Sequence, residues 1–323
     1  MSSFADLETT LAAVPLYLTE HDVASLFEAA DAVPIIEESF RRLAAGEVVN
    51  QPRLRLPLDG GALALMGAVD RGLGLAGVKT YSAVAGNAAF VVVLFDAENG
   101  QCVGVIESNI LGQLRTGAAS AVAAKHLARD GARRLGIIGC GFQAETQVAC
   151  IRAAVPTLEH VTGYCRTEAT LEDFCARVGA EPAETHREAV ADRDVVVTAT
   201  TSKDPVVRGE WVREGALICA VGANHPSRRE LDDVVLERAS FVCCDSREQA
   251  RRESGDLIEP VANGVLDWLE VYELQDVVAG EVRGREAADD IVVFKSNGLA
   301  AWDVAIGAAA LERARERGVG TSL

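Results

Sequence analysis

Hydrophobic and polar positions alternate with a period of two along several short stretches of the first third of the chain. These stretches are 53–56, 62–66 and 75–80, and they are followed by a buried-strand candidate at 89–95, a turn at 96–100 and a returning strand at 102–106. A period of two predicts strands that bury one face, and short turns between them favour antiparallel pairing. Residues 1–50 and 111–128 show helical spacing instead, with Thr19 as the cap of one helix and 32–43 as a second helix.

Beyond residue 134 the pattern changes to short apolar runs separated by helical stretches. The runs at 135–138, 160–164, 195–199, 216–221 and 241–244 predict strands, with helices at 168–178 and 187–191. This alternation is typical of α/β proteins, in which a parallel sheet carries helices on both faces. A last helix at 298–317 presents Val304, Ala308 and Leu311 on one face, so we expect it to pack back on the first part of the chain.

The length of 323 residues and the hydrophobic fraction of 49% are sufficient for two domains with sizeable cores. The change of pattern predicts an α+β domain at 1–115, completed by 298–323. It predicts an α/β domain with a parallel sheet at 116–297.

Segment 135–147, LGIIGCGFQAETQ, reads as a strand, a tight glycine turn and a helix. It carries the G-x-G-x-x-A form of the dinucleotide fingerprint. Gly139 allows the sharp turn, Gly141 leaves room for a pyrophosphate at the backbone, and Ala144 allows the helix to pack close to the strand. The free N–H groups at the helix start would face the phosphates. The alternating strands and helices that follow favour a Rossmann dinucleotide site over a purely structural turn.

The second strand of this unit ends in Tyr164, Cys165, Arg166 and Thr167. In NAD-binding domains an acidic residue near this strand end binds the 2′-hydroxyl of the adenine ribose, and none stands here. Arg166 and Thr167 suit a 2′-phosphate, so NADP(H) is the favoured cofactor. NAD(H) is the alternative if Arg166 only stacks on the adenine.

Later strand ends should line the same crevice. Thr200 lies in a run of small hydroxyl residues at 198–202, which suits a nicotinamide or phosphate. Gly222 and Ala223 follow the 216–221 strand and would let the nicotinamide approach the backbone. His225 is a candidate general acid, although a loop histidine beside a proline is more often simply solvated.

Three cations of the first domain, Arg53, Lys79 and Arg115, stand beside apolar strands or at a helix start. Buried cations need partners. A substrate carboxylate would be such a partner, because an arginine can grip it with two hydrogen bonds. A structural salt bridge is the other possibility, and the sequence leaves both open.

The formal net charge of -17 argues against nucleic acids and anionic membranes as partners. No stretch approaches 18 uncharged apolar residues, and the acidic N-terminus has no signal-peptide pattern. The eight cysteines form no C-x-x-C pair, and no histidine lies at ligand spacing, so neither a zinc site nor a disulfide framework is expected. We expect a cytoplasmic protein with reduced thiols and no metal.

Motifs that cover nearly the whole chain carry a family resemblance. They are QPRLRL around Arg53, GVK at 77–79, LFD at 94–96, RTGAAS at 115–120, GIIGCGFQA at 136–144, VGAN at 221–224, RELD at 229–232, GDL at 255–257 and FKSNGLA at 294–300 with Asp303. Together they resemble the ornithine cyclodeaminase/mu-crystallin family. That family contains ornithine cyclodeaminase, which recycles bound NAD, and alanine dehydrogenases, ketimine reductases and other imine reductases that use NAD(P)H.

The resemblance implies an α/β fold, with a Rossmann dinucleotide-binding domain and an α+β domain that binds substrate and forms a homodimer. It implies that Arg53, Lys79, Arg115 and Asn297 bind the small imino or amino acid, with Lys79, Arg115 and Asn224 as the catalytic residues. The residues that would surround the cofactor are Arg115, Thr116, Gly139, Gly141, Phe142, Gln143, Cys165, Arg166, Thr167, Thr200, Val221, Gly222, Ala223, Arg228 and Ser296.

Two positions depart from the pattern of the family. Ornithine cyclodeaminases carry an aspartate where Asn224 stands, and that aspartate is the acid/base of cyclisation. An asparagine cannot exchange a proton in that role, so the chain resembles the reductase branch more closely. Trp302 stands where relatives often have a polar residue. It either faces the site and favours an apolar or ring-shaped substrate, or packs in the core or a dimer contact.

The leading hypothesis is an NAD(P)H-dependent reductase of imines or ketimines derived from 2-oxo acids, or the reverse amino acid dehydrogenase reaction. Arg53 and Arg115 would hold the carboxylate. Lys79 would contact it too and donate a proton, with its pKa lowered by the neighbouring arginines. An iminium needs no strong acid for the hydride step, which fits Asn224. The alternatives are a cyclodeaminase-type lyase with recycled NAD and a crystallin-like cofactor-binding protein without turnover.

Overall fold

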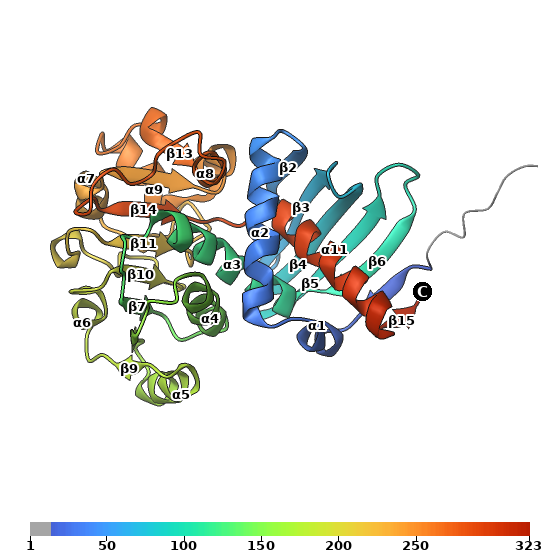
Figure 1. The fold of residues 1–323 in the computed structure, drawn as a ribbon, viewed down its shortest axis with the longest axis horizontal. Helices are drawn as coiled ribbons and strands as arrows, with labels where there is room; N and C mark the ends of the chain where they lie inside the picture. Colours follow the sequence, from blue (N-terminus) through green and yellow to red (C-terminus); the bar gives the residue numbers. More distant parts are fainter. Residues whose placement is uncertain (1–13) are drawn as a thin grey trace, which may run out of the picture.

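The computed structural model describes residues 14–323. Within this range the strands form two sheets, one of seven and one of eight strands, with helices α2 and α3 between them (Figure 1). No helix in residues 14–323 combines the length and the apolar character needed to cross a bilayer.

The seven-stranded sheet gathers strands from both ends of the described chain. Its order is β15-β1-β6-β5-β4-β3-β2, and the neighbours from β6 to β2 pair antiparallel, which confirms the prediction from the alternating pattern. The bounds are β1 (Leu16–Leu18), β2 (Val48–Leu58), β3 (Gly61–Asp70), β4 (Leu75–Val84), β5 (Asn87–Asp96), β6 (Cys102–Glu107) and β15 (Thr321–Ser322).

The prediction of helix throughout residues 1–50 is wrong in part. Its first 13 residues lie outside the described range, and 16–18 form strand β1, which pairs with β6 and β15. Three residues are too few for a periodicity to show, so long-range pairing decides their conformation. The predicted cap is confirmed: Thr19 Oγ1 accepts the N–H of Asp22 at 3.2 Å. The helices that follow are α1 (Glu20–Leu26) and α2 (Ala29–Ala44).

Alternating residues divide this sheet into a covered face and an open face. Helix α11 (Ala300–Arg317) packs across β2–β5 on the covered face, which confirms that the last helix returns to the first sheet (Figure 1). Met66, Lys79 and Val92 lie in register and buried on that side. We call the opposite side the open face; its exposed apolar side chains are Val49, Leu54, Leu56, Leu58 and Val69.

The eight-stranded sheet is parallel throughout, with the order β13-β12-β14-β11-β10-β7-β8-β9. The order reverses between β7 and β10, as in a Rossmann fold, so the predicted α/β class with a Rossmann half is confirmed. The bounds are β7 (Arg134–Ile138), β8 (His160–Tyr164), β9 (Glu181–Pro182), β10 (Val195–Thr198), β11 (Leu217–Ala220), β12 (Phe241–Cys244), β13 (Val271–Glu273) and β14 (Val292–Lys295).

Both faces of this sheet are buried, because alternate residues of one strand join separate hydrophobic clusters. Val195 and Val197 belong to one cluster and Val196 to the other. The helices around the sheet are α4 (Ala144–Ala154), α5 (Glu168–Val178), α6 (His186–Val190), α7 (Asp233–Arg238), α8 (Arg247–Glu253), α9 (Gly255–Ala262) and α10 (Leu274–Val278).

Three strands of this sheet were not predicted, and one of them, β14, lies in its middle between β11 and β12. The apolar run of β14, at 291–294, is as long as the run at 241–244 that was predicted as a strand, so the pattern was sufficient and this strand was missed. Helix α3 (Asn109–Leu127) leads from the first sheet to the second, and the chain returns through α11. The domain boundaries at 115 and 298 stay a prediction.

Trp302 lies in the core, which decides between its two interpretations. Its side chain is fully buried on α11, and its ring meets that of Phe40 on α2 edge-on, with 5.3 Å between centroids. It lines neither of the two cavities described below. The tryptophan therefore joins α11 to α2 rather than selecting a substrate.

We expect Trp302→Ala to lower the free energy of unfolding by about 3–5 kcal/mol, because it leaves a large cavity between α2 and α11. Urea unfolding followed by circular dichroism measures the change. The matched control is Leu269→Ala, at a side chain that is 80% exposed, where we expect a change within about 0.5 kcal/mol. Equal stability of the two variants would contradict the packing role.

Candidate active site

The strand ends of the Rossmann sheet form a crevice where the strand order reverses, and the glycine turn after β7 forms one wall. Gly139 has φ +103°, and a Cβ there would lie 2.4 Å from the carbonyl oxygen of Ala199. Gly222 is as restricted, because its Cβ would lie 2.3 Å from the backbone nitrogen of Thr200. A Cβ at Gly141 would meet nothing within 4 Å. The turn thus leaves open space at the start of α4, where a phosphate group is expected.

Two adjoining cavities occupy this crevice. The first, of about 310 Å³, lies between the first sheet and the glycine turn, and we call it the inner cavity. The second, of about 380 Å³, lies over the end of β8, and we call it the outer cavity. They share Gly141, Ala199, Thr200 and Thr201 in their walls, so one elongated ligand can occupy both.

The structure brings most of the predicted site residues together in these cavities. The inner cavity is lined by Arg53, Arg115, Thr116, Gly141, Phe142, Gln143, Thr200, Val221, Gly222, Asn224, Ser296 and Asn297. The outer cavity is lined by Gly139, Gly141, Cys165, Arg166 and Thr200.

Four predicted residues line neither cavity. Ala223 is completely buried, and Lys79 lies buried on the covered face of the first sheet. Thr167 is the exposed cap position of α5, and Arg228 is half-buried in the loop after Asn224. Their roles, like those of the lining residues, remain predictions.

Lys79, Arg115 and Asp303 form a buried triad that joins β4, α3 and α11. Lys79 Nζ lies 2.7 Å and Arg115 Nε 3.3 Å from the same oxygen, Asp303 Oδ1. Burial lowers the pKa of Lys79 to about 8, Asp303 acts against that fall, and Arg115 adds to it. The predicted direction is right, but desolvation outweighs the neighbouring arginines.

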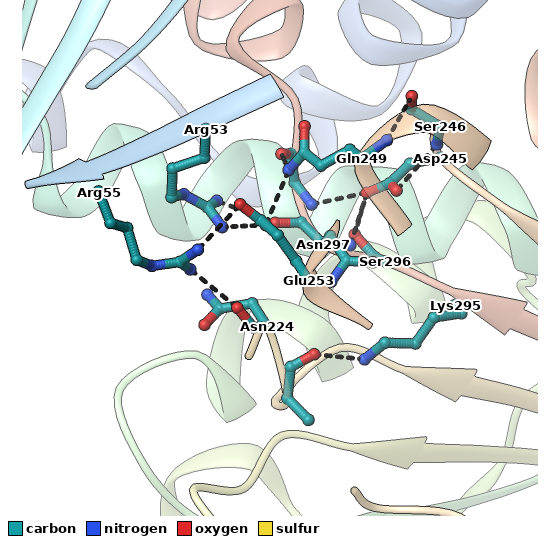
Figure 2. Close-up of polar contacts among 12 residues, drawn as sticks. Arg53, Arg55, Asn224, Asp245, Ser246, Gln249, Glu253, Lys295, Ser296 and Asn297 are labelled. Atoms are coloured by element: carbon teal, nitrogen blue, oxygen red, sulfur yellow. Dashed lines mark hydrogen bonds and ion pairs between the residues drawn. The ribbon is translucent and has the colours of Figure 1, made fainter. Parts of the chain in front are cut away.

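Arg53, Arg55 and Glu253 form a second triad, which joins β2 to α8 (Figure 2). Arg53 Nη1 lies 2.5 Å from Glu253 Oε2, and Arg55 Nη1 lies 3.0 Å from Oε1. Arg53 also donates to the carbonyl of Asn297 at 3.0 Å, and Arg55 donates to that of Asn224 at 2.8 Å. Burial raises the pKa of Glu253, and the two guanidinium groups oppose that rise.

All three predicted cations therefore make a salt bridge, yet two of them also line the inner cavity. A cation here can form a salt bridge and still bind a ligand, because each triad contains two cations and only one carboxylate. Each keeps a surplus positive charge that an anionic ligand can meet.

A buried aspartate holds the segment after β14 in place (Figure 2). Asp245 Oδ2 accepts Ser296 Oγ at 3.0 Å and the N–H groups of Asn297 and Gly298 at 2.7 and 2.6 Å. Burial raises the pKa of Asp245, and these donors oppose the rise. Asp245 thus fixes the hydroxyl of Ser296 and the backbone of Asn297, two residues that line the inner cavity.

A second buried carboxylate holds the two strand ends opposite the glycine turn. Glu230 accepts the N–H and hydroxyl of Thr200, both at 2.8 Å, and the N–H groups of Gly222 and Ala223 at 2.7 and 3.1 Å. Beneath it, Lys295 lies 3.0 Å from Asp256 Oδ2. Burial raises the pKa of Glu230. This network fixes the backbone of the cavity wall before any ligand arrives.

Two residues that line the inner cavity carry buried polar atoms that have no partner in the described part of the chain. Within residues 14–323, Gln143 Oε1 and both amide atoms of Asn297 are buried without a hydrogen-bond partner. Buried polar groups without partners are rare and call for an explanation. A dinucleotide and a polar substrate supply such partners, and the open space at Gly141 admits a pyrophosphate, so the residues fit this ligand.

The outer cavity has the chemistry expected around an adenine ribose. Besides Arg166, it is lined by Tyr164, His186 and Asp204. The rings of Tyr164 and His186 lie 4.3 Å apart, and burial, followed by Arg166, lowers the pKa of His186. The sequence analysis missed His186 and Asp204, which come from elements after β9 and β10.

The loop 224–228 at the rim is exposed. His225 Nδ1 lies 2.8 Å from Ser227 Oγ, and burial lowers the pKa of His225, with Arg55 and Arg228 adding to that fall. These contacts favour the solvated interpretation of His225. No cluster of metal-ligating side chains occurs among the described residues.

The residues that sequence reasoning missed are mainly the acids that hold the site: Glu230, Asp245, Glu253 and Asp303. Two of them fall in motifs noted above, RELD at 229–232 and Asp303, but with no role assigned. What these acids share in the sequence is a position beside buried apolar residues. That pattern indicates a buried acid, but it does not identify the cation or N–H group that the acid binds.

Comparisons with known proteins agree with this architecture. The family model described as "Ornithine cyclodeaminase/mu-crystallin family" matches residues 13–318. Alanine dehydrogenase of Archaeoglobus fulgidus is 35% identical over 319 residues, which cover 95% of this chain and 98% of that protein.

Two solved structures are similar over nearly the whole chain. Thermococcus litoralis Delta(1)-pyrroline-2-carboxylate reductase, in complex with NADH and L-proline, superposes with a TM-score of 0.89 at 32% identity, covering 95% of this chain and 100% of that one. An archaeal alanine dehydrogenase dimer with bound NAD superposes with a TM-score of 0.90 at 34% identity, covering 96% and 98%. This chain belongs to the ornithine cyclodeaminase/mu-crystallin family.

Proposed function

We propose that this protein is a nicotinamide-dinucleotide-dependent reductase of imines derived from 2-oxo acids, and that it also runs the reverse oxidation of the amino acid. The observation that carries the proposal is the inner cavity. It places two guanidinium groups, of Arg53 and Arg115, in the same space as the glycine turn at Gly141. A carboxylate held by the arginines thus lies beside a dinucleotide bound at the turn.

Reduction of a C=N bond adds two electrons with a hydrogen at carbon and a proton at nitrogen. When bound, the reduced nicotinamide would supply the two electrons and the hydrogen at carbon as a hydride, and would itself be oxidised. The chain supplies binding, orientation and the proton. Arg53 and Arg115 grip the carboxylate, while Asn297 and Asn224 offer amide groups to the polar part of the substrate.

Lys79 holds the proton at Nζ, behind Arg115. Its partner Asp303 keeps the ammonium charged despite burial, and Asp303 Oδ2 has no partner among the described residues. Asn224 stands where cyclodeaminases need a proton-exchanging group, so a lyase reaction gains no support from this site. A pKa near 8 makes Lys79 a suitable donor close to neutral pH.

We expect loss of NADPH or NADH absorbance when the protein meets cyclic imino acids or mixtures of 2-oxo acid and amine. The reductive kcat/KM should fall as pH rises through about 8, because the free enzyme then loses the Lys79 proton. Initial rates between pH 6 and 10 measure this profile.

Variants at Lys79 separate this group from titration of the substrate. Lys79→Ala should lower kcat/KM at least about 100-fold. Lys79→Arg keeps the charge but cannot release a proton, so its residual activity should lack the limb near pH 8. Lys125→Ala, at a half-exposed lysine paired with Glu37, is the control. Unchanged turnover of Lys79→Ala would exclude the assignment.

We further propose that NADP(H) is the preferred cofactor. Arg166 lines the outer cavity at the end of β8, and the strand end itself carries no acid. Arg166 would meet a 2′-phosphate with charge-assisted hydrogen bonds, assisted by the hydroxyl of Thr167 on the same turn. His186, beside Arg166, is a further polar group at this place.

Arg166→Ala should weaken NADPH binding about 10- to 100-fold, the equivalent of one charge-assisted contact, and NADH binding much less. Fluorescence titration of reduced cofactor measures both. Arg187→Ala, at an exposed arginine next to His186, should change neither. If the wild-type protein binds NADH as tightly as NADPH, the preference is wrong, although the reductase proposal stands.

We also propose a homodimer formed through the open face of the first sheet. The exposed side chains of Val49, Leu54, Leu56, Leu58 and Val69 form an apolar surface that a second copy would cover. The similarity to an alanine dehydrogenase that forms a dimer supports a second copy as the occupant.

Leu56→Glu should convert the dimer to a monomer, because it buries an unpaired carboxylate in an apolar contact. Sedimentation equilibrium gives the mass. Leu269→Glu, at an exposed leucine outside the open face, should remain dimeric. A monomeric wild-type protein would refute the proposal.

A further inference from the structure

Each triad of the inner cavity sets two cations against one carboxylate. Lys79 and Arg115 share Asp303, and Arg53 and Arg55 share Glu253. Within residues 14–323, no other acidic side chain lies within salt-bridge distance of these four cations. The two triads thus carry two surplus positive charges beside the inner cavity, which Arg53 and Arg115 line, although the whole chain has a formal net charge of -17.

The carboxylate of a simple 2-oxo acid derivative meets one surplus charge. The second surplus lies at Arg55, which is not among the cations proposed above to bind that carboxylate. Arg55 lines neither cavity, but its side chain is 27% exposed and its Nη2 donates to the carbonyl of Asn224, which lines the inner cavity (Figure 2). One bond to Glu253 and one to Asn224 leave further N–H groups of Arg55 free to donate, since a guanidinium carries five.

The surroundings of Arg55 favour an anion as well. The pKa of His225 is lowered by burial and then by Arg55 and Arg228, so Arg55 has further basic groups in its neighbourhood. Among the described residues, Glu253 is the one carboxylate within salt-bridge distance of Arg53 and Arg55, so its single charge does not neutralise both. Cations gathered without matching acids form a site for a negative group.

We infer that the substrate carries two carboxylates, one on the carbon next to the imine and one at the end of a short side chain, with Arg55 as the residue that binds the second. This inference rests on the proposed reductase function and names the substrate class of that site. A second carboxylate would join Glu253 in neutralising the two arginines. With a substrate that lacks the second carboxylate, Arg55 would share the single charge of Glu253 with Arg53.

The test compares oxaloacetate with 2-oxobutanoate, each with ammonia and NADPH or NADH. The two acids share a four-carbon chain and differ in the second carboxylate. We expect kcat/KM to be at least about tenfold higher for oxaloacetate, as one charge-assisted contact gives. Equal values, or a preference for 2-oxobutanoate, would overturn the inference and leave the reductase proposal intact.

Variants assign the preference to one side chain. Arg55→Leu should lower the ratio of the two kcat/KM values at least about tenfold, and Arg55→Lys should retain part of it, because the charge remains. The ratio is the readout because loss of the bond to Asn224 affects both substrates alike. Arg283→Leu, at an exposed arginine that has no hydrogen bond to a cavity-lining residue within residues 14–323, should keep the wild-type ratio. An unchanged ratio in Arg55→Leu would overturn the role of Arg55.

A binding measurement separates failure of this inference from failure of the reductase proposal. Calorimetric titration of the protein with oxidised cofactor compares L-aspartate with L-2-aminobutanoate. If neither oxo acid is reduced, tighter binding of aspartate that is lost in Arg55→Leu still supports the second-carboxylate site. Equal binding of the two amino acids would reject it.

Discussion

The site depends on buried carboxylates that are each shared by two cations. Glu253 reaches from α8 to two arginines of β2, and Asp303 reaches from α11 to Lys79 on β4 and Arg115 on α3. Removing either acid would leave two like charges close together in a water-poor space, which is among the most destabilising changes in a protein interior. The Glu253 pairs join the first sheet to α8 of the Rossmann half, and the Asp303 pairs join β4, α3 and α11.

The wall of the inner cavity on the Rossmann side is also held by buried carboxylates, but these bind different groups. Glu230 and Asp245 accept mainly backbone N–H groups, so they hold the ends of β10, β11 and β14 instead of side-chain cations. A wall held by its backbone loses little freedom when a ligand binds, which is what a preorganised site requires. The glycines at 139 and 222 have the same effect, because at each a Cβ would strike the neighbouring backbone.

The sequence predicted what is encoded locally. The glycine turn, the antiparallel strands and the cations beside them are patterns of a few residues, and the structure places them as expected. The partners of those cations could not be predicted, because Arg53 and Glu253 are 200 positions apart and Lys79 and Asp303 are 224 apart. Strand β1 was missed for a related reason, since a segment of three residues takes its conformation from distant neighbours. The resemblance to a family supplied candidate roles, but not the acids that hold the residues in place.

The balance of charges around Lys79 links binding to chemistry. Burial holds the pKa of this lysine at about 8, against the attraction of Asp303. A carboxylate bound by Arg53 and Arg115 brings a further negative charge close to the ammonium, and a nearby anion raises the pKa of a cation. The proton is therefore held more firmly once the substrate is present than in the empty site. Buried ion pairs contribute little net stability for their cost in desolvation, so if Lys79 is the proton donor proposed above, the Asp303 triad would serve mainly to keep it charged when an anion is bound.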